Sequence, residues 1–228
     1  MIAVVSAYVP IEGHPRSEAE YDRLGRKLMA IDHPVLFAKG DLDHCWLEHM
    51  VQDHPGEVVH AVADNPKKNT LAYHVVQAQK TEWLDVVSTI CPADVLVWID
   101  YGIFHIPGVT KEIIDRFLDR AESEQAIAIP GCWEKGYRYD DNWPCWRFAG
   151  GVMVVPRRFA AAFNAAMKQE YARWLCKTGR VSWEVNVLSR LEKRDPEFPV
   201  WWYGPCGHDS TIFTHYRGTE HGNSRLAS

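Results

Sequence analysis

Short apolar runs alternate along the chain with longer segments in which apolar residues recur at helical spacing. Six runs have the length of strands, at 2–8, 34–39, 57–62, 94–100, 126–130 and 150–156. Several of them are apolar at consecutive positions, as expected for strands that helices cover on both faces of a sheet. The alternation of strands with helices predicts an α/β layered domain.

The segments between these runs carry helix-start signals. Ser17 and Glu20 form a capping-box pattern ahead of an apolar stripe. The other expected helix starts are Asn69 or Thr70, Thr110 and Ser182. A long amphipathic helix is expected from Phe159 to Trp174. We expect a single domain over residues 1–216, followed by a flexible tail over 217–228.

Composition narrows the class of protein. The 228 residues are 46% hydrophobic and include ten tryptophans, which is ample for a packed core and excludes a disordered or fibrous chain. A net charge of −5 gives no general attraction to nucleic acid or to an anionic membrane, although a local basic patch is compatible with it. The six cysteines form no CxxC pair, and the chain shows no signal peptide or long apolar run. We therefore expect a cytoplasmic protein with reduced thiols and no membrane partner.

The segment VLVWIDYGIF, residues 95–104, places Asp100 at the end of a buried apolar run. Open α/β sheets form their ligand crevices at the carboxyl ends of strands, so this position suits a functional carboxylate. An ionised carboxylate beside apolar residues needs a cation or hydrogen-bond donors, and a divalent metal would meet that need. An aspartate that caps its own loop is the alternative, and the pattern leaves both open.

Two later features are candidate ligand contacts. Gly150 and Gly151 open the last apolar run and permit close backbone approach to a ligand, although a simple bulge explains them as well. The irregular stretch 131–149 interleaves aromatic and charged residues, which suits a sugar or another flat acceptor. Its candidate acceptor-binding residues are Trp133, Tyr137, Trp143 and Trp146. A loop pinned to the core by its own tryptophans is the alternative.

Several short segments resemble the HtrL/YibB-like proteins, a group similar to glycosyltransferases of the GT-A fold. In chain order they are VVSAYVPI with RSEAEYDRL, AYHVVQAQKTEWLDV, VWIDYGIF, RFAGGVMVVPRRF and SWEVNVLSRL. They span residues 1–215 and keep the order of the family. The resemblance implies a GT-A-like fold, with a mainly parallel mixed central sheet flanked by helices. It also implies an enzyme that moves a sugar from a nucleoside-diphosphate donor, UDP-linked, to an acceptor hydroxyl.

The same resemblance implies roles for individual residues. The nucleotide-sugar-binding set is Ala7, Tyr8, Arg16, Lys80, Asp100, Gly150 and Gly151. Asp100 and Glu184 are the catalytic candidates, with Glu184 as the base of an inverting enzyme. The helix dipole also favours an acidic residue at that helix start, so the role of Glu184 stays open. For Lys80 the pattern is equally compatible with a solvated lysine on a helix face beside Glu82 and Asp85.

A metal is the least constrained part of this prediction. The D-x-D motif typical of GT-A enzymes is reduced here, because Gly102 stands at its third position. A Mn²⁺ or Mg²⁺ ion would be held by Asp100 with His208 or His215, and Asp209 lies in the same segment. Each of these histidines is also compatible with an ordinary loop position. His44, His49 and His54 recur every five residues, which spreads them around a helix, and no metal is assigned to them.

Other functions compete with a transferase. A catalytically inactive nucleotide- or sugar-binding protein of the same fold fits the missing second aspartate. A dinucleotide-dependent oxidoreductase is disfavoured because no G-x-G-x-x-G follows the first strand. An interaction scaffold would leave Asp100 without a purpose. The acceptor of a transferase stays open among a glycan, a protein, a small molecule and a modified nucleobase in DNA.

Overall fold

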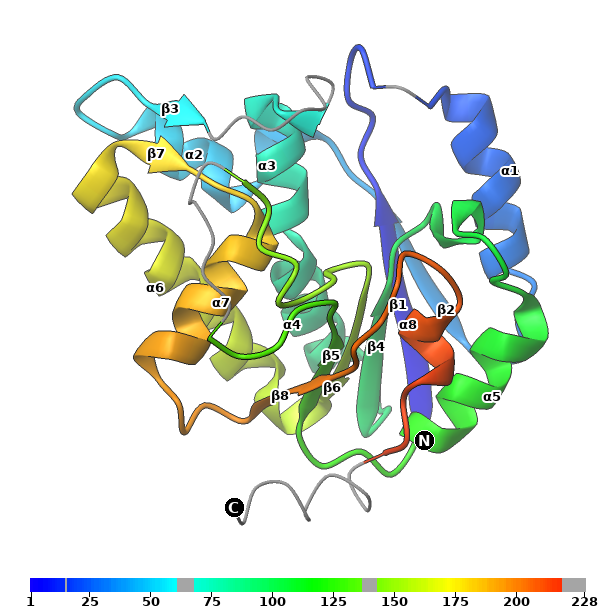
Figure 1. Cartoon of the computed structure of the whole chain (residues 1–228). Coiled ribbons are helices and arrows are strands. Elements are labelled where there is room, and N and C mark those ends of the chain that lie inside the picture. Colours follow the sequence, from blue (N-terminus) through cyan, green and yellow to red (C-terminus); the bar gives the residue numbers. More distant parts are fainter. Residues whose placement is uncertain (15, 61–67, 137–142, 219–228) are drawn as a thin grey trace.

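A six-stranded sheet runs through the centre of the molecule (Figure 1). The computed structural model describes residues 1–14, 16–60, 68–136 and 143–218. The strands follow the order β2-β1-β4-β6-β5-β8. Their bounds are β1 Ile2–Tyr8, β2 Val35–Lys39, β4 Val95–Ile99, β5 Ile127–Pro130, β6 Val152–Pro156 and β8 Val200–Tyr203. Neighbours are parallel except that β6 is antiparallel to both β4 and β5. The predicted α/β fold with a mainly parallel mixed sheet is therefore confirmed.

Helices cover both faces of this sheet because its strands are apolar at consecutive positions. Ala3 and Val5 of β1 face one core, and Ile2 and Val4 face the other. The first core is closed by α2 (Trp46–Gln52), α3 (Leu71–Ala78), α4 (Lys80–Ile90), α6 (Ala160–Thr178) and α7 (Glu184–Arg194). The second is closed by α1 (Glu18–Leu28), α5 (Lys111–Ala121) and α8 (Thr211–Thr214). Short 3-10 turns lie at η1 (Leu42–His44), η3 (Ile103–His105) and η4 (Arg157–Phe159).

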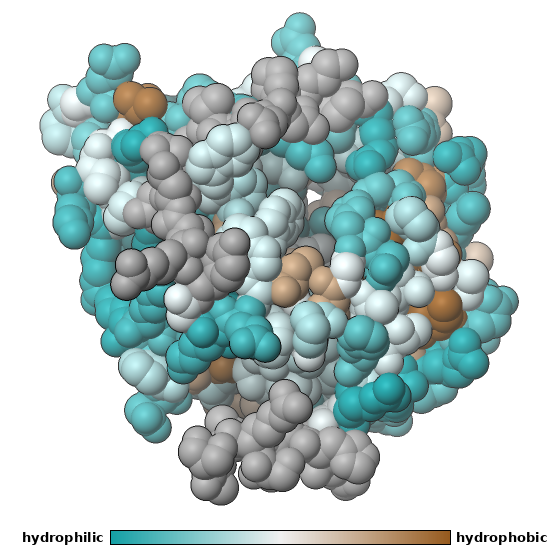
Figure 2. Space-filling model, in the orientation of Figure 1, coloured by the Kyte–Doolittle hydropathy of each residue, from teal (hydrophilic) through white to brown (hydrophobic). Residues whose placement is uncertain are grey.

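The described surface carries its exposed large hydrophobic side chains at scattered positions, among them Phe37, Ile90 and Trp143. Within the described ranges, no helix combines the length and the apolar character needed to cross a lipid bilayer. The face drawn in Figure 2 is mostly hydrophilic, and its described hydrophobic residues are scattered. The apolar strands β4, β5 and β6 are buried at every position, whereas the tryptophans range from buried Trp98 to exposed Trp143 and Trp146.

Three predicted helix starts are confirmed by their caps. The Ser17 hydroxyl accepts the backbone N–H of Glu20 at 3.2 Å, so the capping-box serine does begin α1. Thr70, rather than Asn69, caps α3 by accepting from the N–H of Tyr73 at 3.2 Å. Thr110 caps α5 in the same way. Each hydroxyl satisfies a backbone donor that the first helical turn leaves without a partner.

Other boundaries differ from the prediction. The helix expected from Thr70 onward is interrupted at Gln79, which separates α3 from α4. The last long helix, α7, begins after Trp183 instead of Ser182, because Trp183 is extended with φ −61° and ψ 149°. The run 57–62 contributes only β3, Val59–His60, and its residues 61–62 lie outside the described residues.

Two strands have no counterpart in the prediction. Strand β7 (Arg180–Val181) pairs with β3 in a separate two-stranded sheet, and β8 closes the edge of the large sheet beside β5. A two-residue strand is too short to show an alternating pattern, so its partner decides whether it forms. Residues 219–228 of the expected tail lie outside the described residues.

The antiparallel direction of β6 determines which residues meet at the side of the sheet where β1 and β4 end, called here the sheet edge. Because β4 and β6 are antiparallel, the end of one strand lies beside the beginning of the other, with Ile99 opposite Val152. The Asp100 N–H accordingly donates to the Gly151 carbonyl oxygen at 2.9 Å. β1 runs parallel to β4, so its last residue, Tyr8, ends at the same edge.

Candidate functional site

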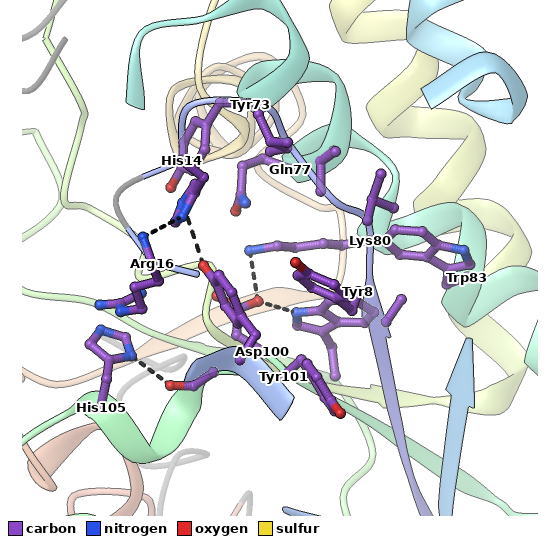
Figure 3. A pocket seen from close by; sticks show the side chains of 17 residues that line it. Tyr8, His14, Arg16, Tyr73, Gln77, Lys80, Trp83, Asp100, Tyr101 and His105 are labelled. Atoms are coloured by element: carbon purple, nitrogen blue, oxygen red, sulfur yellow. Dashed lines mark hydrogen bonds and ion pairs between the residues drawn. The ribbon is translucent and has the colours of Figure 1, made fainter. Parts of the chain in front are cut away.

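A pocket opens at this edge, between the ends of β1 and β4 and the helix pair α3 and α4 (Figure 3). Five residues of the expected donor-binding set line it, namely Ala7, Tyr8, Arg16, Lys80 and Asp100. They come from four separate segments, which the sheet topology and the packing of α4 bring together. The crevice expected at the carboxyl ends of the strands is therefore present.

Lys80 lies at the centre of a buried ionic cluster beneath the pocket. Its Nζ is 3.0 Å from Asp100 Oδ1 and 3.2 Å from Glu184 Oε1, and it donates to the Gly150 carbonyl oxygen at 2.9 Å. The side chain is only 3% exposed, so the alternative of a solvated helix-face lysine is wrong. Glu82 and Asp85 instead accept from Asn164 Nδ2, at 2.7 and 3.0 Å.

The charge on Lys80 is stabilised by its two carboxylate neighbours. Burial by itself disfavours the charged amine, but the negative charges of Asp100 and Glu184 outweigh it and raise the pKa of Lys80 above its ordinary value. Lys80 is therefore a permanent cation at physiological pH. Its three N–H donors all have partners in this cluster, so it acts on the pocket by holding Asp100.

The Asp100 carboxylate is fixed on one side and open on the other. Oδ1 accepts from Lys80 and, at 2.7 Å, from Trp98 Nε1. The described residues give Oδ2 no hydrogen bond, and 37% of the side chain is exposed. Trp98 is itself held by a stacked contact with Trp83, with ring centroids 5.5 Å apart. Asp100 therefore lines the pocket with a carboxylate that is oriented through one oxygen and has the other available.

The two glycines before β6 lie against the protein's own carboxylates. A Cβ on Gly150 would lie 2.3 Å from Glu184 Oε1, and one on Gly151 would lie 3.4 Å from Asp100 Oδ2. Neither glycine lines the pocket, and β6 begins after them at Val152. Gly150 thus makes room for Glu184, whereas the contact at Gly151 would be an ordinary one.

Glu184 is the first residue of α7, and its side chain is 8% exposed. Its carboxylate faces Lys80 and Gly150, and it does not line the pocket. The structure therefore places the residue expected as a base within the ionic cluster, behind Lys80.

Aromatic rings form much of the pocket wall, and most were missed as site residues. Tyr8 lies between Tyr21 and Tyr101, with centroids 5.0 and 5.8 Å away. Tyr73, Gln77 and Lys80 follow one another at intervals of four and three residues, so they share one face of the α3–α4 pair. That spacing is the sequence signal that would have identified Tyr73 and Gln77. Tyr101 directly follows Asp100, and His105 lies in the 3-10 turn η3 that comes next, so their place in the chain beside Asp100 was the available signal.

The C-terminal histidines lie at two different places. His208 lies beside His105 of the pocket wall, with ring centroids 5.7 Å apart. His215 Nδ1 donates to the Pro205 carbonyl oxygen at 2.7 Å, and Asp209 accepts from the N–H of Thr211 at 2.8 Å. In the described part of the chain, no three His, Cys, Asp or Glu side chains gather in a way that would hold a metal. A metal held by Asp100 with these histidines stays a prediction.

The described part of the aromatic stretch 131–149 is held by polar contacts. Arg147 forms a two-pronged ion pair with Glu192, at 2.6 and 3.0 Å, and donates to the Trp133 carbonyl oxygen. Asn186 holds the backbone on either side of Pro144 through Trp143 and Cys145. Trp143 and Trp146 remain 44% and 43% exposed, so these two rings do not pin the loop to the core.

None of the tryptophans expected to bind an acceptor lines the pocket, and Tyr137 lies outside the described residues. Trp133 is half-buried, and Trp143 and Trp146 present their rings to solvent. Their role as acceptor contacts stays a prediction.

Comparison with known proteins gives only distant likenesses. No protein-family model and no curated protein sequence matches this chain. The crystal structure of mouse xyloside xylosyltransferase 1 in its apo form is similar over 87% of this chain and 83% of its own, with 11% identity and a TM-score of 0.43. The structure of CMP:2-keto-3-deoxy-manno-octonic acid synthetase complexed with CTP is similar over 99% and 98%, with 10% identity and a TM-score of 0.43. Membership of the HtrL/YibB-like proteins is not shown.

Proposed function

We propose that this chain is a glycosyltransferase that transfers a sugar from a nucleoside-diphosphate donor, UDP-linked, to an acceptor hydroxyl. The observation that carries the proposal is the oriented Asp100 carboxylate at the carboxyl edge of the sheet. Its Oδ1 is held by Lys80 and Trp98, its Oδ2 has no hydrogen bond among the described residues, and Asp100 lines a pocket walled by aromatic rings. Such a carboxylate can accept hydrogen bonds from sugar or ribose hydroxyls without first reorganising.

A bound diphosphate would need cations in addition to Lys80, because the charges around Asp100 do not attract an anion. Lys80, Asp100 and Glu184 together carry one net negative charge, so the cluster alone repels an anion. Besides Lys80, Arg16 is the cation that lines the pocket, and among the described residues its carboxylate contact is a loose one with Glu20 at 3.9 Å. Lys68 lies close enough to Arg16 and Asp100 for their charges to act on it, and burial and then the charge of Arg16 lower its pKa below the ordinary value. We assign these two residues to the diphosphate, and we assign Lys80 to the positioning of Asp100.

A divalent ion would fit this site only as a partner of the donor. The chain supplies one open carboxylate oxygen, Asp100 Oδ2, and Mg²⁺ in particular is commonly bound by one or two carboxylates together with substrate phosphates and water. A Mn²⁺ or Mg²⁺ ion bound there would stabilise the negative charge that grows on the leaving diphosphate. The net negative charge of the Lys80 cluster favours such an ion electrostatically.

The first experiment measures release of UDP from a panel of UDP-sugars by the wild-type protein, with and without Mn²⁺. Asp100→Asn keeps the size of the side chain and removes its charge, so we expect turnover to fall by about 10²–10³. Asp43→Asn, an exposed aspartate of η1, is the matched control and is expected to keep full activity. Unchanged turnover in Asp100→Asn would contradict the proposal. Tight donor binding without turnover in the wild type would favour the inactive binding protein.

Glu184→Gln distinguishes two roles for the buried carboxylate. A base would remove the proton of the acceptor, so the variant would lose turnover on the order of 10²–10⁴ while its donor affinity stays unchanged. A positioning residue acts through Lys80 and Asp100, so the variant would weaken donor binding as well. The contacts of Glu184 with Lys80 and Gly150 favour the second result. The measurement is kcat and donor KM for the variant beside the wild type.

A further inference from the structure

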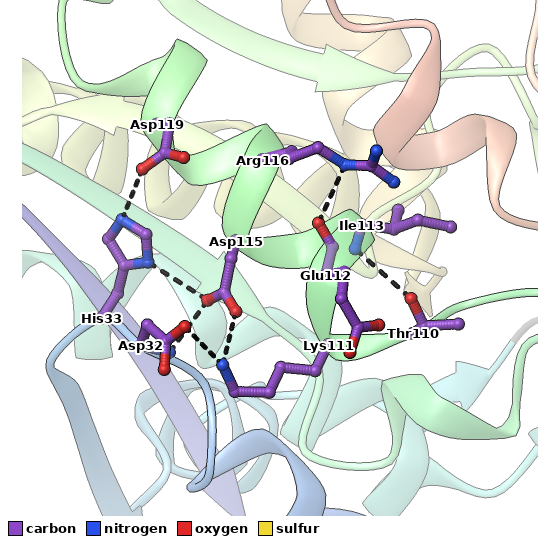
Figure 4. A network of polar contacts seen from close by, with 9 residues as sticks. All are labelled: Asp32, His33, Thr110, Lys111, Glu112, Ile113, Asp115, Arg116 and Asp119. Carbon is purple, nitrogen blue, oxygen red and sulfur yellow. Dashed lines mark hydrogen bonds and ion pairs between the residues drawn. The ribbon is translucent and has the colours of Figure 1, made fainter.

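A second hollow lies between α5 and α8 and shares no lining residue with the pocket at the sheet edge. It is lined by Ile113, Arg116, Arg120, Thr214, His215 and Arg217. Figure 4 shows Arg116 and Ile113 on the side of α5 that faces away from His33. Four of the six lining side chains are arginine or histidine, in a chain whose net charge is −5.

The three arginines of this hollow have no carboxylate partner among the described residues. Arg116 Nε donates to its own helix, at the Glu112 carbonyl oxygen, 3.1 Å away. Arg120 Nη2 reaches the Phe213 carbonyl oxygen at 3.5 Å, the limit of a hydrogen bond. All three side chains are exposed. Most of their N–H donors therefore remain available at the surface.

The opposite face of α5 shows that acidic partners were available to this helix. Asp115 and Asp119 flank His33 there, each 3.3 Å from one of its ring nitrogens, and Lys111 pairs with Asp115 at 2.9 Å (Figure 4). Arg116 and Arg120, in contrast, are like charges four residues apart on one helix. Such a pair destabilises a helix by a few tenths of a kcal/mol unless an anion lies between them.

We propose that the hollow lined by Arg116, Arg120 and Arg217 binds the phosphate group of a small soluble ligand. Guanidinium groups present planar forks of N–H donors that match phosphate oxygens, and three of them converge on one hollow. The hydroxyl of Thr214 adds a neutral donor at the same place. The arrangement is a compact hollow between two helices, whereas a polynucleotide requires a basic stripe along its backbone. The proposal is independent of the glycosyltransferase assignment.

Calorimetric titration of the full chain with inorganic phosphate at low ionic strength tests the site. The double variant Arg116→Gln/Arg120→Gln should bind phosphate at least about tenfold more weakly than the wild type. Arg23→Gln, which removes one exposed arginine of α1, is the matched control and should stay within about twofold. If the double variant does not fold, Arg217→Gln replaces it, and a weakening of about threefold or more is expected.

Two results would overturn the proposal. The first is phosphate binding that survives in Arg116→Gln/Arg120→Gln but is lost in Arg16→Gln, which would place the anion in the pocket at the sheet edge. The second is wild-type binding to phosphatidylglycerol vesicles or to a single-stranded oligonucleotide with no binding of free phosphate. A membrane surface or a nucleic acid would then be the partner of these arginines.

Discussion

Two groups of cations differ in how their charge is neutralised. One is Lys80 at the sheet-edge pocket, and the other is the set of arginines between α5 and α8. Lys80 is buried, and the chain itself supplies two carboxylates and a carbonyl oxygen around it. Arg116, Arg120 and Arg217 are exposed, and the described chain supplies no carboxylate to them. Burying an unpaired charge costs several kcal/mol, so a buried cation must be neutralised within the fold. An exposed cation is solvated by water, so it needs no carboxylate from the chain and is accessible to a ligand.

Removing the buried cation is expected to cause the largest loss of stability. Lys80→Met leaves Glu184 as a buried carboxylate without a cation and frees Asp100 from its anchor. The free energy of unfolding should fall by about 3–5 kcal/mol, measured by urea denaturation. Lys39→Met is the control, because it breaks an exposed ion pair with Glu18 that solvent screens, and it should cost far less stability. Equal losses in the two variants would show that the buried cluster is not stabilising.

Crowding the cluster is expected to have the next largest effect. In Gly150→Ala the added methyl would meet Glu184 Oε1 at 2.3 Å, and Glu184 is itself held by Lys80. We expect a loss of about 1–3 kcal/mol in the free energy of unfolding. Gly151→Ala meets its nearest atom at an ordinary 3.4 Å and should cost less than about 1 kcal/mol. A larger loss in Gly151→Ala than in Gly150→Ala would contradict the packing described here.

The two faces of α5 should contribute differently to the loss of stability in acid. Burial by itself would raise the pKa of Asp115, but hydrogen bonds from Lys111, the Asp32 N–H and His33 lower it below its ordinary value. This carboxylate therefore stabilises the fold above the unfolded-state pKa, and the contribution is lost as pH falls through the lower folded-state pKa. In Asp115→Asn the free energy of unfolding should fall less steeply below about pH 4 than in the wild type. Denaturation at a series of pH values measures this slope. Arg116→Gln should leave that slope unchanged, because an arginine does not titrate there.

Relieving the repulsion between the arginines is expected to have the smallest effect. In phosphate-free buffer, Arg116→Gln should raise the free energy of unfolding by about 0.2–0.5 kcal/mol, because it removes a like-charge pair at positions i and i+4. Added phosphate should stabilise the wild type more than this variant, as measured by thermal melting. A loss of stability in phosphate-free buffer would indicate that Arg116 has an internal partner instead.

Much of the fold was predictable because its signals are local. The consecutive apolar positions of 94–100 and 126–130 correspond to the buried strands β4 and β5. Ser17 and Thr110 cap the helices that they were expected to begin. A strand buried on both faces or a capped helix start depends on residues a few positions apart. The two strands that the prediction missed, β7 and β8, have only two and four residues, so each offers too short a pattern to be recognised without its partner.

The sequence by itself determined that this chain folds as an α/β layered domain and that Asp100 ends a buried strand at the edge where such sheets bind ligands. Only the tertiary structure decided that Lys80, Asp100 and Glu184 form one cluster, and that Gly150 makes room for it. Their contacts span up to 104 residues of chain. Charge pairing over that separation depends on the reversal of β6 and on the packing of α4 and α7, which no local pattern encodes.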